Sequence, residues 1–462
     1  MHSIIFDLET SDRETVGQIL NYAFLLVDEE WQVKRELCGT VRLSRLQIPS
    51  SGAILANRVN VLELQKTAQQ SEREAARAIA IFMEEVIAEA RAPVAFIGYN
   101  SFRFDVPYLR TTLIRNGINP YFGAGNLVYR DLFAAARKLA ATNHKFPRVE
   151  GEAQADGKKK LSLRLESLAR ALKLLKGKQT HESRSDALLT VALAQCLHSE
   201  FGFDVRRQDT YEGLKFHGAG KPRVLTMLDP NYDLSISEIA ERTPVTLLNF
   251  DRRYALWINL KRFAAGEGRR SVMFFKNQGS SMILDPDWQA EAHFEEVAVR
   301  AHAEFKELTV SNFFKRSTCD IEQDIFRVDF DGIGALHAAI WEGQREAVKE
   351  LANRDVTALY VRNVIANHTW GSPSDESVEK KLREYADYRY GGSMVLSKVA
   401  EPDDGTAPRR HPTLREMLTE LNKALIVAND DDRRLLEALL AYTKSSDVVR
   451  FCGPNLLADS AA

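Results

Sequence analysis

Two acidic residues near the N-terminus have types and spacing suited to holding a metal ion. Asp7 and Glu9 lie in residues 3–9, SIIFDLE, where β-branched and apolar residues predict a strand. Side chains two positions apart share one face of a strand, so both carboxylates point to one side while Phe6 and Leu8 point to the other. A carboxylate pair of this kind can hold a hard cation. A solvated turn at a strand end is the alternative for this pair taken alone.

Two further acidic residues stand where helices are expected to begin. In residues 98–105, GYNSFRFD, a strand-like run ends and Asp105 appears at the start of the next helix. In residues 181–186, HESRSD, His181 precedes Asp186 by five positions, and Asp186 lies in the first turn of another helix. Histidine can exchange a proton near neutral pH, which suits a general base. Each aspartate taken alone is better explained as a helix N-cap.

The elements that must position these residues are predicted to form a mixed α/β sheet. Strands are expected at 3–9, 18–28, 31–43 and 93–98. Helices are expected at 71–90, from about 105, from about 131, at 162–176 and at 184–200. Three strands followed by alternating helix and strand favour a sheet with helices packed on it. The polar segment 145–160 lacks periodicity, so a loop is predicted there.

The remainder of the chain changes character after residue 204. Short strand-like runs at 244–250, 254–260 and 271–275 predict a small β-rich region, and the helical period returns from about 310. A linker rich in Pro, Gly and Asp occupies 401–405. A chain of 462 residues exceeds what one core usually serves. We therefore expect three domains, at 1–204, 205–310 and 311–462.

Composition excludes several classes of protein. The chain has 62 basic and 64 acidic residues, a net charge of −2, so no overall basic character marks a nucleic-acid binder. A local basic track and a carboxylate cluster can cancel in that sum. Its four cysteines form no CxxC pair, which indicates neither a zinc site nor a disulfide framework. No uncharged run approaches the ~20 residues of a membrane span, and no signal sequence opens the chain, so a cytoplasmic location is expected.

In their order and spacing, the three acidic motifs resemble the DEDDh, DnaQ-like superfamily of 3′→5′ exonucleases. The five-residue step from His181 to Asp186 favours the histidine subtype over the tyrosine subtype. The long spacing between Asn100 and Asp105, and the segment RLESL at 164–168, resemble bacterial exonuclease I. Weaker similarities to that family lie at 243–260, 324–326 and 355–367.

This resemblance implies a fold and a set of residue roles. The fold would be an RNase H-like exonuclease domain, then a small SH3-like β domain and a mainly helical C-terminal domain. Two Mg²⁺ ions, with Mn²⁺ as a substitute, would be held by Asp7, Glu9, Asp105 and Asp186, and His181 would be the general base. Arg164 would grip a substrate phosphate, and contacts to the terminal nucleotide would come from Thr10, Asn100 and Phe102.

The resemblance also implies a substrate and partners. The family degrades single-stranded DNA from a free 3′ end to 5′-mononucleotides in DNA repair and recombination, and docks onto the acidic tail of single-stranded-DNA-binding protein. No membrane partner is expected. Basic residues facing a DNA channel, or simply a solvated surface, are Arg252, Arg253, Lys261, Arg262, Arg269 and Arg270. Two alternatives stay open: a ribonuclease or broad-range 3′-trimming exonuclease, and a nucleic-acid-binding protein with a retired active site.

Overall fold

The structure is a computed structural model of the 462-residue chain. It describes residues 2–102, 104–121, 125–153, 159–177, 181–207, 222–228, 242–251, 254–276, 283–284, 289–313, 376–394 and 410–452. Several sequence features lie outside these described residues: the similarities at 324–326 and 355–367, the linker at 401–405, and Arg252 and Arg253.

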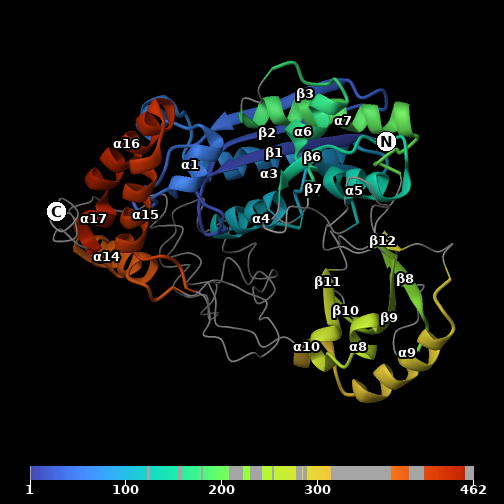
Figure 1. The fold of residues 1–462 in the computed structure, drawn as a ribbon. Helices are drawn as coiled ribbons and strands as arrows, with labels where there is room; N and C mark the ends of the chain where they lie inside the picture. Colours follow the sequence, from blue (N-terminus) through green and yellow to red (C-terminus); the bar gives the residue numbers. More distant parts are fainter. Residues whose placement is uncertain are drawn as a thin grey trace.

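The N-terminal part is built on a five-stranded mixed sheet with the order β3-β2-β1-β4-β5. Its strands are β1 (Ser3–Thr10), β2 (Ile19–Val27), β3 (Val33–Thr40), β4 (Val94–Gly98) and β5 (Leu127–Asp131). β1 pairs antiparallel with β2 and parallel with β4, so it lies in the middle of the sheet (Figure 1). The four predicted strands are confirmed, and β5 is an edge strand that the sequence patterns did not predict.

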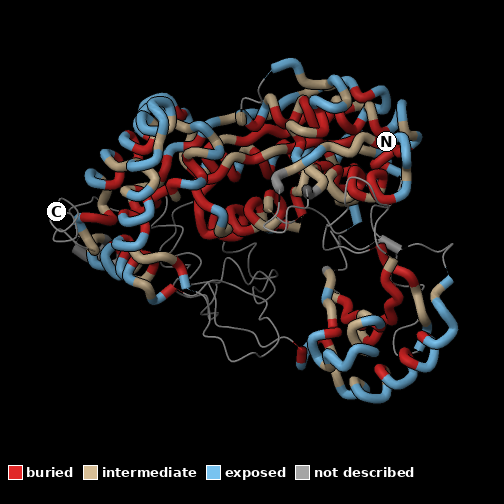
Figure 2. The backbone as a smooth tube through the Cα atoms, in the orientation of Figure 1, coloured by how far each residue is buried: buried red, intermediate tan, exposed pale blue. Residues whose placement is uncertain are grey.

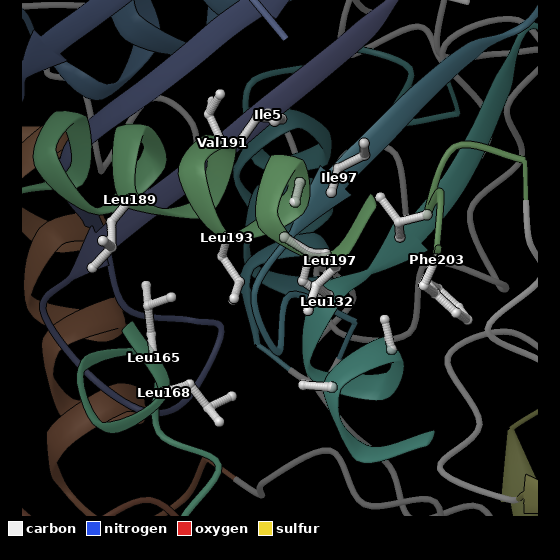
Figure 3. Close-up of a cluster of buried hydrophobic side chains, with 14 of the residues drawn as sticks. Ile5, Ile97, Leu132, Leu165, Leu168, Leu189, Val191, Leu193, Leu197 and Phe203 are labelled. Atoms are coloured by element: carbon white, nitrogen blue, oxygen red, sulfur yellow. The ribbon is translucent and has the colours of Figure 1, made fainter. Parts of the chain in front are cut away.

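Helices cover both faces of this sheet. They are α3 (Glu72–Glu89), α4 (Asp105–Arg115), α5 (Leu132–Thr142), α6 (Leu165–Ala171) and α7 (Ser183–Phe201). Phe6 and Leu8 pack with α3 and α4, whereas Ile5 packs with α5, α6 and α7. Figure 3 shows side chains from β1, β4, α5, α6 and α7 converging on this second core. Asp7 and Glu9 continue the strand period of Ile5, so they lie on the α7 side.

Two predictions for this part need correction. The segment 145–160 is not simply a loop, because β6 (Glu150–Ala153) and β7 (Lys159–Leu161) form a two-stranded antiparallel hairpin. The helix predicted at 162–176 ends at Ala171, since Lys173 has a φ of 61° that a helix cannot continue through. The structure also has two short helices that were not predicted, α1 (Ser51–Asn57) and α2 (Val61–Thr67).

A second, antiparallel sheet follows in the middle of the chain. Its strand order is β11-β10-β9-β8-β12. The strands are β8 (Leu225–Leu228), β9 (Arg242–Phe250), β10 (Tyr254–Asn259), β11 (Val272–Lys276) and β12 (Ile283–Leu284), with α8 (Leu260–Ala264), η2 (Gly268–Ser271), α9 (His293–Glu304) and α10 (Val310–Phe313) beside them. Trp257 is fully buried in this region. The predicted β-rich region is confirmed.

The described C-terminal residues are mainly helical, as predicted. They form α14 (Glu376–Tyr390), α15 (Leu414–Val427), α16 (Asp430–Ser445) and α17 (Asp447–Cys452). These helices pack beside α1, at the end of the N-terminal sheet (Figure 1). Figure 2 shows buried residues running through that sheet and into this contact. No helix among the described residues is long and apolar enough to cross a membrane.

Candidate metal centre

Asp7 and Glu9 project side by side from the end of β1. Both residues are partly exposed, whereas their neighbours Phe6 and Leu8 are buried. The pairing with β2 shifts its register directly after Glu9, which marks an irregularity at this strand end. Such irregularities re-aim side chains and end strand pairing. The predicted division of the strand into an acidic and an apolar face is therefore confirmed.

The N-terminus of α7 brings Asp186 to this strand end. Asn21 lies opposite Glu9 in the sheet, and its Oδ1 accepts a hydrogen bond from the backbone N–H of Ser183 at 3.1 Å. The N-cap residue Glu182 makes no side-chain capping hydrogen bond. Asn21 therefore satisfies one of the N–H groups that a helix start leaves unpaired, and it docks the helix against the sheet.

Three carboxylates converge as a result. Oxygen atoms of Asp7, Glu9 and Asp186 all lie within 4.8 Å of one another. Oxygen donors are the ligands that Mg²⁺ prefers, and Mg²⁺ keeps several waters, so three carboxylates suffice to hold it. The donor set therefore fits the predicted divalent ion. It also matches a hard cation better than a zinc site, which favours nitrogen and sulfur ligands.

A tight turn after β4 brings in the fourth carboxylate, Asp105. Gly98 ends β4. A Cβ at this position would lie 2.5 Å from the Cβ of Ser101 in the turn that follows, so a larger residue does not fit. The carboxylate of Asp131, the buried N-cap of α5, accepts hydrogen bonds from the backbone N–H groups of Asn100 at 2.8 Å and Phe102 at 3.2 Å. The turn is thus fixed from the neighbouring strand β5.

Burial and nearby negative charge raise the pKa values of three of these carboxylates. Burial, followed by the charges of Asp105, Glu9 and Asp186, raises the pKa of Asp7 well above its ordinary value. Burial and the charges of Asp186 and Asp105 raise the pKa of Glu9 to about 9. Burial, with the charge of Asp131, raises the pKa of Asp105 to about 8, although backbone hydrogen bonds act in the opposite direction. Asp105 lies outside the group of three but within electrostatic reach of it.

Like charges brought together in this way call for a compensating cation. Desolvation and neighbouring carboxylates both disfavour the ionised forms, so the cluster is strained while it lacks positive charge. A divalent ion would remove that strain by pairing with the carboxylates directly. The same environment would lower the stability of a protein in which these residues served only as helix caps.

His181 precedes the helix that carries Asp186. It is half-buried, stands two residues before α7, and has a φ of 52°. A non-glycine residue in this left-handed region is uncommon and is found most often at functional sites and turns. Among the described residues, His181 is not part of the three-carboxylate group. Its role as general base stays a prediction.

The three predicted nucleotide contacts are placed nearby but have other partners. The hydroxyl of Thr10 donates to the carbonyl of Asp12 at 2.9 Å. Phe102 is only 9% exposed, and its ring centroid lies 6.0 Å from that of Tyr129, so its ring is part of the local packing. Asn100 has a φ of 57° and contributes its backbone N–H to the Asp131 contact. Asn100 and Phe102 belong to the turn after β4 and Thr10 to the end of β1, and the contact of all three with a nucleotide stays a prediction.

Arg164 has an exposed side chain at the start of α6. The preceding residue, Leu163, accepts a hydrogen bond from the hydroxyl of Tyr99, which directly follows β4. This bond ties the start of α6 to the turn that carries Asp105. The proposed grip of Arg164 on a substrate phosphate stays a prediction.

Sequence patterns missed two residues that build the site. Asp131 was predicted only as the start of a helix, although a strand followed by an acidic N-cap was the signal available. Asn21 has no local signal, because its contact with Ser183 spans 162 positions. Both act through the backbone of other segments, and such contacts depend on the tertiary fold.

Comparison with known proteins identifies the fold. By sequence, no family model and no curated protein matches the chain. By structure, it is similar to E. coli exonuclease I in complex with a dT13 oligonucleotide, at 15% identity over 97% of this chain and 100% of that one, with a TM-score of 0.69. The zinc-bound complex of E. coli exonuclease I with single-stranded DNA matches at 15% identity over 97% and 99% of the two chains, with a TM-score of 0.71.

A complex of exonuclease I with SSB-Ct also matches, at 14% identity over 96% and 99% of the two chains, with a TM-score of 0.66. These likenesses span nearly the whole of both chains. They confirm the predicted fold class, a mixed α/β exonuclease-type domain followed by a small β region and a mainly helical C-terminal region. The resemblance to exonuclease I is thereby confirmed at the level of the fold.

Proposed function

We propose that the chain is a divalent-metal-dependent 3′→5′ exonuclease that hydrolyses single-stranded DNA to 5′-mononucleotides. The observation that carries the proposal is the convergence of Asp7, Glu9 and Asp186, whose oxygens lie within 4.8 Å of one another, with Asp105 close enough to raise the pKa values of Asp7 and Glu9. A fold alone hosts many activities, so the site carries the argument. The fold adds support, because structural relatives include exonuclease I bound to single-stranded DNA.

The four carboxylates would hold two Mg²⁺ ions, or Mn²⁺ in their place. When bound, such ions supply a water nucleophile at neutral pH, neutralise the scissile phosphate and stabilise the departing 3′ oxygen. Asp7 is influenced by the charges of all three other carboxylates, and we propose that it would contribute to holding both ions. The zinc-bound relative supports a divalent ion in this fold.

The protein residues then have distinct tasks. His181 is proposed to take the proton from the attacking water as a general base. Arg164 is proposed to grip a phosphate through two parallel hydrogen bonds, which the planar guanidinium favours. Asp131 and Asn21 would hold the turn and the helix that carry Asp105 and Asp186.

The remaining assignments follow from the same proposal. We propose domains at 1–204, 205–310 and 311–462, a cytoplasmic location and a part in DNA repair. Single-stranded DNA is the proposed substrate, and docking onto single-stranded-DNA-binding protein is supported by the relative solved with SSB-Ct.

The proposal is tested with a panel of 3′-labelled substrates: single-stranded DNA, single-stranded RNA and duplex DNA, each with Mg²⁺ or with EDTA. We expect wild type to release mononucleotides from single-stranded DNA only when Mg²⁺ is present. Asp7→Ala and His181→Ala should lower the rate by at least about 100-fold, because a general base alone contributes about 10² to 10⁴. His144→Ala, at an exposed histidine, is the matched control and should retain the wild-type rate.

Each alternative predicts a different result in the same panel. Faster release from RNA would indicate a ribonuclease or a broad-range trimming enzyme. A wild-type protein that binds single-stranded DNA and is as inert as Asp7→Ala on every substrate would indicate a retired active site and would contradict the proposal.

A further inference from the structure

Two C-terminal helices, α14 and α16, contact the N-terminal part at residues 46–48. The hydroxyl of Tyr390, the last residue of α14, donates to the carbonyl of Leu46 at 2.8 Å and accepts from the N–H of Ile48 at 2.9 Å. The hydroxyl of Tyr442, in α16, donates to the carbonyl of Gln47 at 3.1 Å. Buried hydrogen bonds from two helices therefore fix the segment 44–48.

Apolar packing makes this contact continuous with the core. Leu46 and Ile48 share one buried cluster with side chains of α14, α15 and α17. Leu20, at the start of β2, shares another with side chains of α1, α2, α15 and α16. Because these side chains are almost completely buried, the helices are held as an extension of the N-terminal core and not as a loosely tethered module.

One ion pair in this contact joins α14 to Asp12, which follows the end of β1. Arg389, 1% exposed on α14, places a guanidinium nitrogen 3.4 Å from a carboxylate oxygen of Asp12. Asp12 is itself buried, and its other oxygen accepts from the backbone N–H of Glu14 at 3.3 Å. The guanidinium carbon also lies 4.9 Å from the ring centroid of Tyr390. A buried cation on a C-terminal helix thus holds a residue that is 377 positions away in the sequence.

Asp12 in turn holds the end of β1. The backbone carbonyl of Asp12 accepts the hydrogen bond from the hydroxyl of Thr10, the residue next to Glu9. The carbonyl of Thr10 accepts from the side-chain amide of Asn57, in α1, at 2.7 Å. Regular pairing with β2 is interrupted after Glu9, so these contacts take over the support of the strand end.

Helix α1 completes the link between the two parts. Ser50 donates its backbone N–H to the carbonyl of Ser11 at 2.8 Å, and Ser51 donates its hydroxyl to Glu420 of α15 at 3.2 Å. Figure 1 shows α1 next to α15 and α16 at the end of the sheet. The segment 10–12 is therefore contacted both by α1 and its N-cap and by α14.

We propose that Arg389 is a positioning residue for the metal centre, and that the C-terminal helices brace the strand end carrying Glu9 through the Arg389–Asp12 pair. The inference rests on the proposed function and extends it to a residue that touches neither metal nor substrate. A productive site needs its ligands held to within about 0.5 Å of the right geometry. Without the Arg389–Asp12 pair, the end of β1 is held less firmly, so Glu9 should bind the ion less tightly. Groups that orient metal ligands typically change metal affinity by about 10- to 100-fold.

The test uses the full chain and measures Mn²⁺ binding by calorimetry together with the melting temperature. Arg389→Leu is expected to weaken Mn²⁺ binding about 10-fold and to lower the melting temperature, because it leaves Asp12 buried without its cation. If the protein hydrolyses single-stranded DNA, kcat should fall while KM for DNA stays near the wild-type value. Mn²⁺ binding is measured without DNA, so this test does not depend on nuclease activity.

A second variant separates positioning from stability. Asp12→Ala/Arg389→Leu removes both charges, so no unpaired charge is left buried and the melting temperature should rise again toward that of wild type. The strand end stays unbraced, so Mn²⁺ binding should remain about 10-fold weaker. Recovery of Mn²⁺ affinity together with the melting temperature would overturn the proposal, because the pair would then be purely structural.

The matched control breaks another ion pair in the same contact. Arg45 pairs with Asp447 of α17, and neither residue touches the segment 10–12 among the described contacts. Arg45→Leu should keep wild-type Mn²⁺ affinity. If Arg45→Leu weakens Mn²⁺ binding as much as Arg389→Leu does, general loosening of the contact explains the effect. Unchanged Mn²⁺ affinity in Arg389→Leu would also overturn the proposal.

Discussion

At the scale of single residues, buried like charges give the site a measurable dependence on pH. A carboxyl whose pKa is higher in the folded than in the unfolded chain stabilises the fold fully below its unfolded pKa, and this contribution is lost as the pH rises through the folded pKa. For Glu9 the window runs from 4.5 to about 9, and for Asp105 from 3.8 to about 8. The metal-free protein should therefore lose stability between these limits.

We predict that in EDTA the melting temperature falls as the pH is raised from 5 to 9, and that Mg²⁺ offsets this fall. In Asp7→Asn one of the repelling charges is absent, so the fall should be shallower and the melting temperature at pH 8.5 should exceed that of wild type in EDTA. A shift of about 2–4 °C is expected for each kcal/mol of relieved repulsion. Differential scanning fluorimetry checks this, and identical pH profiles for the two proteins would count against the charged cluster.

A second prediction at this scale concerns Asp131, whose carboxylate fixes the turn that carries Asp105. Asp131→Ala removes both turn contacts and the N-cap of α5, so Mn²⁺ affinity should fall about 10-fold or more and stability by about 1–3 kcal/mol. Ser71→Ala, which removes the N-cap of α3 far from the turn, is the control. It should cost about 1 kcal/mol and leave Mn²⁺ affinity unchanged. Equal Mn²⁺ affinities in the two variants would contradict the role given to Asp131.

At the scale of elements, the site depends on how α7 is docked against the sheet. Asn21→Ala removes the hydrogen bond to the backbone of Ser183, so the start of α7 should fray and Asp186 should be held less firmly. We expect Mn²⁺ affinity to drop by about 10-fold. Asn60→Ala, at the N-cap of α2, removes hydrogen bonds of the same kind away from the site and should not change it. Calorimetric titration of both variants with Mn²⁺ tests whether Asn21→Ala weakens binding and Asn60→Ala does not.

The elements also show how far sequence patterns reach. The two-residue period of β1 correctly placed Asp7 and Glu9 on one face, and the helical period over 71–90 correctly predicted α3. Helices α1 and α2 are seven residues each, too short for a clear period, and so they were missed. The β6–β7 hairpin was missed because polar side chains dominate it, and no alternation of apolar residues marks its strands.

At the scale of the whole molecule, contacts distant in sequence could not be predicted. Pairs such as Arg389 with Asp12 carry no local signal, since each residue alone is an ordinary surface type. The apolar clusters shared by the two parts of the chain could not be predicted either. Apolar positions in α15 and α16 indicate that these helices are covered, but not which segment covers them. The sequence patterns therefore predicted the acidic residues that converge, Asp7, Glu9 and Asp186, but not the distant contacts that hold their segments in place.

The shared core predicts how the molecule responds to a cavity at this contact. Leu439, 1% exposed on α16, packs with residues of α1 and α2. Leu439→Ala should cost about 2–5 kcal/mol and lower the melting temperature accordingly. Ile426, 78% exposed on α15, offers the matched control, and Ile426→Ala should be nearly neutral. Thermal unfolding of both variants tests this, and equal effects would show that the helices are not held by this core.

The central claim is that the carboxylates of Asp7, Glu9, Asp105 and Asp186 form one centre for divalent cations. Crystals grown with Mn²⁺ and a 5′-mononucleotide would locate the ion by its anomalous scattering. The account predicts a peak at about 2.0–2.6 Å from oxygens of Asp7, Glu9 and Asp186. A crystal with well-ordered carboxylates and no peak among them would contradict it.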